Sequence, residues 1–305
     1  MKDTIYYKQA ELVLRILPYV DSEKNFALKG GTAINFFLRD LPRFSIDIDL
    51  AYVPVNSRNM ALEDISRSIE NISTKIKRIF PDCILSFKKN KQHEAIRSLI
   101  VNQNGVTIKI EPNLVIRGTI YETKVMRLSQ KAQNLFEMSV SSKTLSSAEL
   151  YGGKICAALD RQHPRDLFDV HLLLENEGIN EQTRKAFLVY LISHPRPIVE
   201  VLNPTLLDIR KIFENEFQGM TLIDIELKDL LETRKKLVTS LKASLTEEEK
   251  QFIGSVKMGQ PEWDQLGLKD VENLPAVQWK LLNIRKMEKS KHKKAIEKLR
   301  NYLEI

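Results

Sequence analysis

The stretch LKGGTAINFFLRDLPRFSIDIDL, residues 28–50, holds the pattern that decides the fold of this chain. A short apolar segment at 26–28 leads into Gly30-Gly31-Thr32, and we expect the segment AINFFLR behind it to form a helix. Residues 46–50 then alternate strictly, so that Asp47 and Asp49 share one face of a strand and apolar residues share the other. A glycine turn, a helix and an acidic strand in this order predict a single α/β unit.

The residue types in this unit suit phosphate chemistry. A Gly-Gly turn between a strand and a helix lets the backbone approach a phosphate, and the helix N-terminus offers unpaired N–H groups. Asp47 and Asp49 are about 6.6 Å apart along their strand, and their carboxylates suit one or two Mg²⁺ ions. A Gly-Gly pair alone is often only a turn, and an Asp-x-Asp pair alone is often a solvated strand face. The combination of the three features is therefore what indicates phosphoryl transfer.

The rest of the first half continues as α/β. Apolar residues at helical spacing predict helices over 5–17 and 58–79. Strands are expected at 83–88, 96–102 and 106–111, and the hairpin turn Gln103-Asn104-Gly105 joins the last two. Two more strand-like runs lie at 119–127 and 135–140. We therefore expect a small mixed sheet that carries the acidic pair.

The character of the sequence changes near 142–146, where strand patterns give way to helical ones. A helix is expected from Ala148, capped by Ser146 or Ser147. Further helices are expected at 165–175, 181–193, 205–217, 222–243 and 246–256. The sequence thus predicts an α/β domain over residues 1–143 and a helical domain over residues 144–305.

Composition excludes several classes of protein. With 43% hydrophobic and 29% charged residues, the chain as a whole is not expected to be disordered. Two cysteines far apart, Cys83 and Cys156, exclude a disulfide framework and a cysteine zinc site and suit a reducing cytoplasm. No apolar run approaches the roughly 20 residues of a membrane span, and the N-terminus lacks a signal-peptide cleavage site. We expect a cytoplasmic protein with no membrane partner.

Positive charge is concentrated at the C-terminus. Residues 285–305 hold eight Lys or Arg against three Glu, a net +5 of the chain's +7. Arg285, Lys289 and Lys293 fall on one stripe of a helix, while Leu299 and Leu303 belong to its apolar side. Such a helix suits contact with a polyanion, and a solvated terminal helix is the equally common alternative.

A second block, AELYGGKICAALDRQHPRDLFDVHLLL at 148–174, carries further candidates. Gly152 and Gly153 lie inside an expected helix, where each costs about 1 kcal/mol relative to Ala, so another backbone or a ligand is expected to approach closely there. Lys154 follows them. Asp166 and Asp169 open the next helix, where acidic residues also stabilise the helix dipole, and Asp169 is placed to orient Arg165.

These two blocks resemble the AbiEii/AbiGii family of nucleotidyltransferase-like toxins, found in bacterial abortive-infection and toxin–antitoxin systems. The family belongs to the DNA polymerase β-like nucleotidyltransferases. The resemblance implies an α/β (α+β) fold in which a polymerase-β-like mixed sheet is followed by a helical C-terminal region that contributes to the active site.

The resemblance also implies roles for individual residues. Gly30-Gly31-Thr32 would hold the triphosphate, and Asp47 and Asp49 would be catalytic and bind Mg²⁺. Lys154 would direct a cation toward the phosphates, and Asp166 would belong to the active site.

Two further residues are candidates. Glu111 follows Ile108-Lys109-Ile110 and would complete the metal site as a third carboxylate, although it is Glu where Asp is commoner; an exposed strand residue is the alternative. Arg43 would clamp a phosphate or orient Asp47, and a plain salt bridge is the alternative.

The expected function is Mg²⁺-dependent transfer of a nucleoside monophosphate from an NTP to an RNA acceptor, the 3′ end of tRNA, which would block translation. A cognate antitoxin is the expected partner. Two alternatives stand: transfer to a small-molecule or protein hydroxyl, and a nucleotide- or RNA-binding regulator that does no chemistry.

Overall fold

The computed structural model describes residues 2–90 and 95–305. Contacts between Cα atoms divide the chain into two compact units, which are described separately below. Unit 1 comprises Met1–Leu150 and Gly219–Asp224, and unit 2 comprises Tyr151–Gln218 and Ile225–Ile305. The short segment 219–224 joins unit 1 because it lies along residues 42–44, where the amide of Phe44 donates to the carbonyl of Met220 over 2.9 Å.

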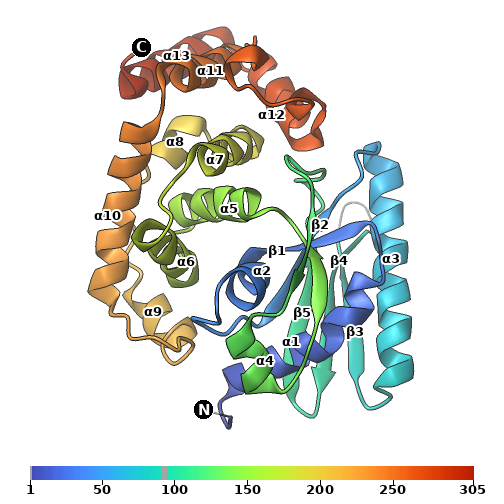
Figure 1. Cartoon of the computed structure of the whole chain (residues 1–305). Helices are drawn as coiled ribbons and strands as arrows, with labels where there is room; N and C mark the ends of the chain where they lie inside the picture. The colour runs from blue at the N-terminus through green and yellow to red at the C-terminus, as the bar shows by residue number, and fades with distance from the viewer. Residues whose placement is uncertain (1, 91–94) are drawn as a thin grey trace. The chain divides into compact units, whose positions relative to one another are not determined.

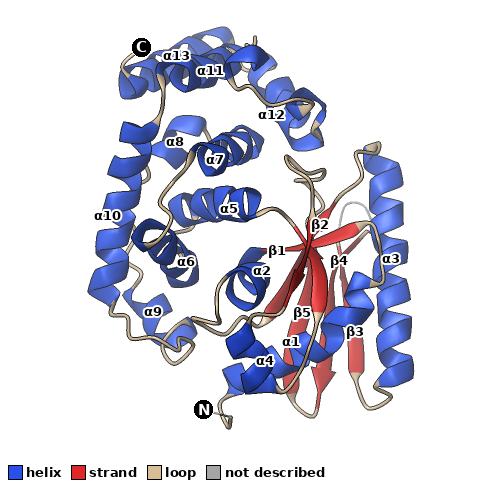
Figure 2. Cartoon of the chain, in the orientation of Figure 1, coloured by secondary structure: helices blue, strands red, loops and turns tan. Residues whose placement is uncertain are grey.

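Unit 1 is built on one mixed sheet, which has seven strands among the described residues (Figures 1 and 2). The order across the sheet is β3-β4-β5-β2-β1-β7-β6, in which β2 runs parallel to β5 and β1 runs parallel to β7. The other neighbouring strands are antiparallel. The strands are β1 Phe26–Lys29, β2 Asp47–Tyr52, β3 Ile84–Lys89, β4 Ile96–Gln103, β5 Val106–Pro112, β6 Lys124–Arg127 and β7 Ser141–Thr144.

Two amphipathic helices, α1 (Ile5–Asp21) and α3 (Arg58–Ile79), pack against each other and against the sheet (Figure 1). The side chains of Ile65, Ile69, Ile72 and Ile76 in α3 are fully buried, as their helical spacing predicts. On β2, Ile48 belongs to the same core, whereas its neighbours Asp47 and Asp49 are only half-buried. The alternation of apolar and acidic residues over 46–50 therefore predicts correctly that the two aspartates lie outside the core.

The segment behind the glycines is helical, as expected, but in two parts. A single turn, α2 (Gly30–Ala33), continues as the π-helical segment η1 (Ile34–Leu38). The strand expected at 135–140 is wrong: its first two residues end helix α4 (Gln130–Phe136), and the strand β7 begins only at Ser141. Ala132 and Phe136 are buried one helical turn apart, and Phe136 stacks on Tyr7 with ring centroids 5.0 Å apart.

The described residues of unit 2 form helices and the loops between them. Its first helix, α5, begins in unit 1 and continues into unit 2. Its elements are α5 Ser147–Asp160, α6 Pro164–Glu175, α7 Glu181–Ser193, α8 Ile198–Leu202, α9 Arg210–Glu216, α10 Leu227–Ser244, α11 Glu247–Met258, α12 Pro275–Arg285 and α13 Lys289–Leu303, with 3₁₀ turns at Trp263–Gln265 and Val271–Asn273. An α/β fold with a mixed sheet followed by helices was the expected class, and it is confirmed.

Two helices are shorter than the sequence predicts. The expected helix at 205–217 begins only at Arg210, because the side chain of Gln162 bonds the backbone of Thr205 and Leu207 outside any helix. The expected helix at 222–243 begins at Leu227, because residues 219–224 pair with 42–44 instead. The basic C-terminus also divides, since α12 ends at Arg285 and α13 begins at Lys289, so the stripe expected over both residues does not run along one helix.

Candidate active site

The glycine turn lies against the acidic strand in unit 1. Gly30 has a φ of +69°, and a Cβ built on it would overlap the carboxylate of Asp49. A Cβ on Gly31 would lie 2.7 Å from Arg43 Nη2 and 3.0 Å from Ser45 Oγ. Each glycine therefore makes room for a polar side chain of the site, in addition to allowing the turn.

The hydroxyl of Thr32 acts inside the protein. Thr32 is fully buried, and its Oγ1 donates to the carbonyl oxygen of Asp47 and lies 2.9 Å from Ser45 Oγ. These contacts fix the start of β2 against α2. Thr32 thus holds the backbone of Asp47 in place, while the backbone of the turn remains the part suited to a phosphate.

Arg43 is the largest of the fully buried side chains, with an exposed fraction of 2%. Its Nη1 donates to the carbonyl of Phe44 over 2.8 Å, and its Nη2 lies beside Gly31. The guanidinium is therefore packed beneath the glycine turn, and Arg43 supports the turn from inside.

The third carboxylate of the sequence prediction lies beside the acidic pair. β2 and β5 are parallel, and their register places Asp47 beside Lys109 and Asp49 beside Glu111. Neighbouring residues in such a register share a face of the sheet. Asp47, Asp49 and Glu111 thus share one face of the sheet, as the alternation predicts. Lys109, the register partner of Asp47, lies on the same face.

A hollow of about 410 Å³ adjoins this face within unit 1. Asp49 and Glu111 line it together with two cations, Lys29 and Arg97. The remaining lining residues are Leu50, Asn90, Pro112, Asn113, Leu114 and Val115. Sequence analysis gave no role to Lys29 or Arg97: Lys29 directly precedes the glycine turn, which is a usable signal, whereas nothing in the sequence marks Arg97.

The donor set of this face fits a hard divalent cation. Over residues 2–90 and 95–305, no three His, Cys, Asp or Glu side chains stand close enough together to hold one metal ion. Asp47 and Asp49 remain as two half-buried carboxylates on one face of the strand. Mg²⁺ is commonly bound by one or two carboxylates with substrate phosphates and water supplying the rest, so the pair fits this ion without a third protein ligand.

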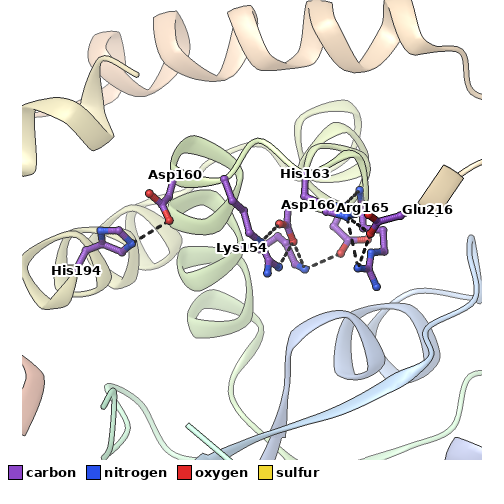
Figure 3. Close-up of polar contacts among 9 residues, drawn as sticks. Lys154, Asp160, His163, Arg165, Asp166, His194 and Glu216 are labelled. Carbon is purple, nitrogen blue, oxygen red and sulfur yellow. Dashed lines mark hydrogen bonds and ion pairs between the residues drawn. The ribbon is translucent and has the colours of Figure 1, made fainter. Parts of the chain in front are cut away.

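The motif residues of unit 2 form a buried ionic cluster (Figure 3). Lys154 Nζ lies 2.8 Å from Asp166 Oδ1 and 3.0 Å from Asp169 Oδ2, and the three side chains are at least nine-tenths buried. Arg161 adds a second cation, with its Nε 2.5 Å from Asp166 Oδ2. Asp169, which was expected to orient Arg165, thus pairs with Lys154.

The electrostatics of this cluster keep Asp166 ionised. Burial opposes the charged form, but Lys154 and Arg161 outweigh it and hold the pKa of Asp166 well below its usual range. Asp166 therefore carries its charge at neutral pH. Arg161 was not among the residues predicted from the sequence, because its place directly after α5 gives no sign of its contact with Asp166.

The glycines before Lys154 are explained by packing inside unit 2. A Cβ on Gly152 would lie 2.6 Å from the backbone nitrogen of Phe187, and one on Gly153 would lie 3.1 Å from the ring of Tyr190. Helix α7 thus approaches α5 at backbone distance, as the two costly glycines predict. The close approach is by protein, so the glycines serve the packing around Lys154.

The histidines that flank the aspartates have structural partners. His163 caps α6 by accepting the amide of Arg165 at Nδ1 over 3.1 Å, and its Nε2 lies 3.2 Å from Glu216 Oε2 (Figure 3). His171 Nδ1 lies 2.9 Å from Thr233 Oγ1. Both contacts tie α6 to other parts of unit 2. In a separate pair, His194 Nε2 lies 3.3 Å from Asp160 Oδ2.

Comparisons with known proteins agree with this description. Among solved structures, the chain is similar to MenT4, a nucleotidyltransferase toxin from Mycobacterium tuberculosis H37Rv, with a TM-score of 0.59, 15% identity and coverage of 92% of this chain and 94% of that chain. At that identity the likeness shows a shared fold. A comparison with curated protein sequences finds no match. No helix in the described part of the chain is long and apolar enough to cross a membrane.

The family comparison covers most of the sequence. The profile described as "Nucleotidyl transferase AbiEii toxin, Type IV TA system" matches residues 12–282, which include both motif blocks and the whole of β2, α5 and α6. The resemblance read from the two blocks is therefore confirmed, and the chain belongs to the AbiEii family of nucleotidyltransferase toxins.

Proposed function

We propose that this protein transfers a nucleoside monophosphate from an NTP to the 3′ end of an RNA, with tRNA as the acceptor, in a Mg²⁺-dependent reaction that blocks translation. The observation that carries the proposal is the acidic pair, Asp47 and Asp49, on the strand face next to the glycine turn. Membership of the family supplies the class of reaction. The acceptor hydroxyl would attack the α-phosphorus, its proton would pass to solvent, and pyrophosphate would leave.

The turn and its neighbouring cations suit a triphosphate. The first amides of α2 have no partner within the helix, and a phosphate can approach them because Gly30 and Gly31 lack side chains. Lys29 and Arg97 line the hollow beside Asp49 and supply positive charge for the phosphate oxygens. We propose that these four residues orient the NTP.

Asp47 and Asp49 are the residues that would hold Mg²⁺, and Glu111, paired with Asp49 in the register, would add negative charge near the ion without being a third ligand. The ion would supply charge neutralisation on the phosphate oxygens that the reaction makes more negative. The protein's own part is to fix the two carboxylates, which it does by pinning the carbonyl of Asp47 to Thr32 and packing Asp49 against Gly30. Positioning of this kind accounts for much of catalysis in phosphoryl transfer.

Lys154 and Asp166 enter the proposal through the family motif. The cluster with Arg161 and Asp169 fixes the ammonium of Lys154 in one position and keeps it charged beside two carboxylates. We propose that Lys154 is required for transfer and that Asp166 positions it. The family description also implies an antitoxin, and we propose a cognate antitoxin as partner and the cytoplasm as the site of action.

Incubation with each α-labelled NTP and total RNA tests the proposal. The expected result is label in tRNA that requires Mg²⁺ and disappears in Asp49→Asn. Label in protein or in a small molecule would overturn the RNA acceptor. Absence of label with all four NTPs and Mg²⁺, in protein that is folded by circular dichroism, would overturn the transfer itself.

A further inference from the structure

The C-terminal end of unit 2 presents a concentration of positive charge that the chemistry above does not use. We call this set the C-terminal basic surface. Its members are the exposed side chains of Arg285, Lys286, Lys289, Lys291, Lys293, Lys294, Lys298 and Arg300. With three glutamates in the same segment they give +5, so this short stretch carries most of the chain's net charge of +7.

Packing fixes which side of α13 faces outward. Leu299 and Leu303 are buried, and the hydroxyl of Tyr302 donates to the carbonyl of Leu202 over 2.9 Å. His292 Nε2 lies 2.7 Å from the carbonyl of Lys257, at the end of α11. The helix therefore docks by this side, against α8 and α11, and holds its lysines in solvent.

The lysines of this surface form no close ion pairs with the described residues of the chain. Within the described part of the chain, none of its six lysines has a carboxylate within 4.0 Å. Two of the three local glutamates are engaged elsewhere: Glu288 accepts the amides of Ser290 and Lys291, and Glu304 pairs with Lys242 over 2.7 Å. Binding of an anionic partner would therefore reduce the repulsion among these lysines.

An exposed tryptophan lies on α12, the helix that precedes α13. Trp279 on α12 has an exposed fraction of 59%, and Leu282, three residues on, has 40%. Lys286 follows at i+7, which places it on the same face one residue beyond the helix end. An exposed aromatic ring on the same helix face as a cation suits single-stranded nucleic acid, because a base can stack on the ring while a phosphate meets the charge.

We propose that the C-terminal basic surface and Trp279 bind single-stranded RNA, with phosphates on the lysines and a base stacked on Trp279. The inference rests on the proposed function, since it assigns a binding surface to the RNA acceptor. Phosphate contacts fix the position of an RNA without reading its sequence, so the surface would accept RNAs of many sequences. An acidic protein would meet the same charges, and competition by a polyanion without bases distinguishes it from RNA.

Binding is measured without NTP or Mg²⁺, by anisotropy of a fluorescent 20-nucleotide single-stranded RNA titrated with the full chain at several salt concentrations. Neutralising Lys286, Lys289 and Lys293 to Gln is expected to make the slope of log affinity against log salt shallower by about 2. The matched control neutralises Lys211, Lys235 and Lys269, which are exposed lysines elsewhere in unit 2, and is expected to leave the slope unchanged. An equal change in both triple variants would overturn the proposal.

The aromatic part has its own variants. Trp279→Leu is expected to weaken RNA binding by about 5- to 150-fold, whereas Trp279→Phe, which keeps a ring, retains most of it. Equal affinity of the wild type and Trp279→Leu would overturn stacking. Displacement of RNA by polyglutamate of equal charge, as effectively as by unlabelled RNA, would show an acidic protein as the partner instead. If RNA binds to this surface as expected but receives no label from NTP, the proposed transfer reaction is wrong, whereas the proposed RNA-binding surface is supported.

Discussion

The carboxylate of Asp49 occupies the space in which a side chain on Gly30 would lie. Gly30 directly follows β1, whose last residue, Lys29, is paired with Asp49 in the β1–β2 register. The glycine turn and the acidic strand are therefore in direct contact, and a side chain added at Gly30 would displace the Asp49 carboxylate. The sequence order that suggested phosphate chemistry thus has a direct steric counterpart.

Gly30→Ala is expected to lower transfer by on the order of 10²-fold, because the new methyl group displaces the Asp49 carboxylate. Gly105→Ala is the matched control: its φ of +84° gives similar backbone strain of about 1–2 kcal/mol, but no atom lies within 4 Å of the added Cβ. Turnover and thermal unfolding are measured for both. Similar turnover in the two variants would contradict the steric link between the turn and Asp49.

Asp47→Asn and Asp49→Asn are each expected to reduce transfer by on the order of 10³-fold while the fold is kept. The melting temperature should stay equal or rise, because each change removes one of two like charges on the same strand face. Asp82→Asn, an exposed aspartate of the same unit, serves as the control. Full turnover in both variants under Mg²⁺ would remove the acidic pair from the active site.

Lys154→Ala and Asp166→Asn are expected to lower turnover per folded molecule by about 10²–10³-fold. Lys154→Ala should also cost about 3–5 kcal/mol of stability, because it leaves Asp166 and Asp169 buried without their shared cation. Asp160→Asn, which removes a carboxylate paired with Arg196 in the same unit, should leave turnover unchanged. If all three variants lose only stability, the cluster is structural and the motif roles do not apply.

Sequence patterns predicted the parts of the fold that depend on near neighbours. The hairpin at Asn104-Gly105 is a local feature, because its turn needs only two adjacent residues that adopt positive φ. The alternation of Asp47 and Asp49 is local as well, because a strand places every second residue on the same face. The faces of α1 and α3 follow from helical spacing for the same reason. These features needed no knowledge of distant contacts.

The two helices that begin later than predicted share one physical origin, which is competition by groups far away in sequence. Residues 205–209 have apolar spacing, but Gln162 and Arg234 take their backbone groups out of the helix. Residues 219–224 pair with 42–44, across a gap that no local pattern spans. The same holds for the site: the partner of Lys154 was visible only once α5 and α6 were packed together, and Arg97 only once the sheet was formed.

Arg97→Ala is expected to raise the KM for NTP by about 10- to 100-fold with little change in kcat, because a charge-assisted contact to a phosphate is worth about 1.5–3 kcal/mol. Arg97 is exposed, so the melting temperature should not change. Arg127→Ala, an exposed arginine on edge strand β6, is the control. An unchanged KM would show that the cation in the hollow beside Asp49 does not contact the nucleotide.

Glu149→Gln is expected to flatten the pH dependence of stability. Glu149 is almost fully buried and accepts the amides of Ile120 and Tyr121 over 3.1 and 3.4 Å. Burial raises its pKa to about 7 against the opposing effect of those two amides. Between the ordinary pKa of a glutamate and about 7, the folded protein therefore binds a proton that the unfolded chain does not, so this group lowers the free energy of unfolding as pH rises.

The size of that effect sets the measurement. The raised pKa makes the wild type lose up to about 3 kcal/mol more than Glu149→Gln between pH 5 and pH 8. Urea unfolding at four pH values in this range gives the difference directly, with other titrating groups cancelling between the two proteins. Glu122→Gln, at an exposed glutamate next to Tyr121, should follow the wild type. Parallel curves for the wild type and Glu149→Gln would mean that the carboxylate stays ionised when buried, with the two amides outweighing the loss of solvent.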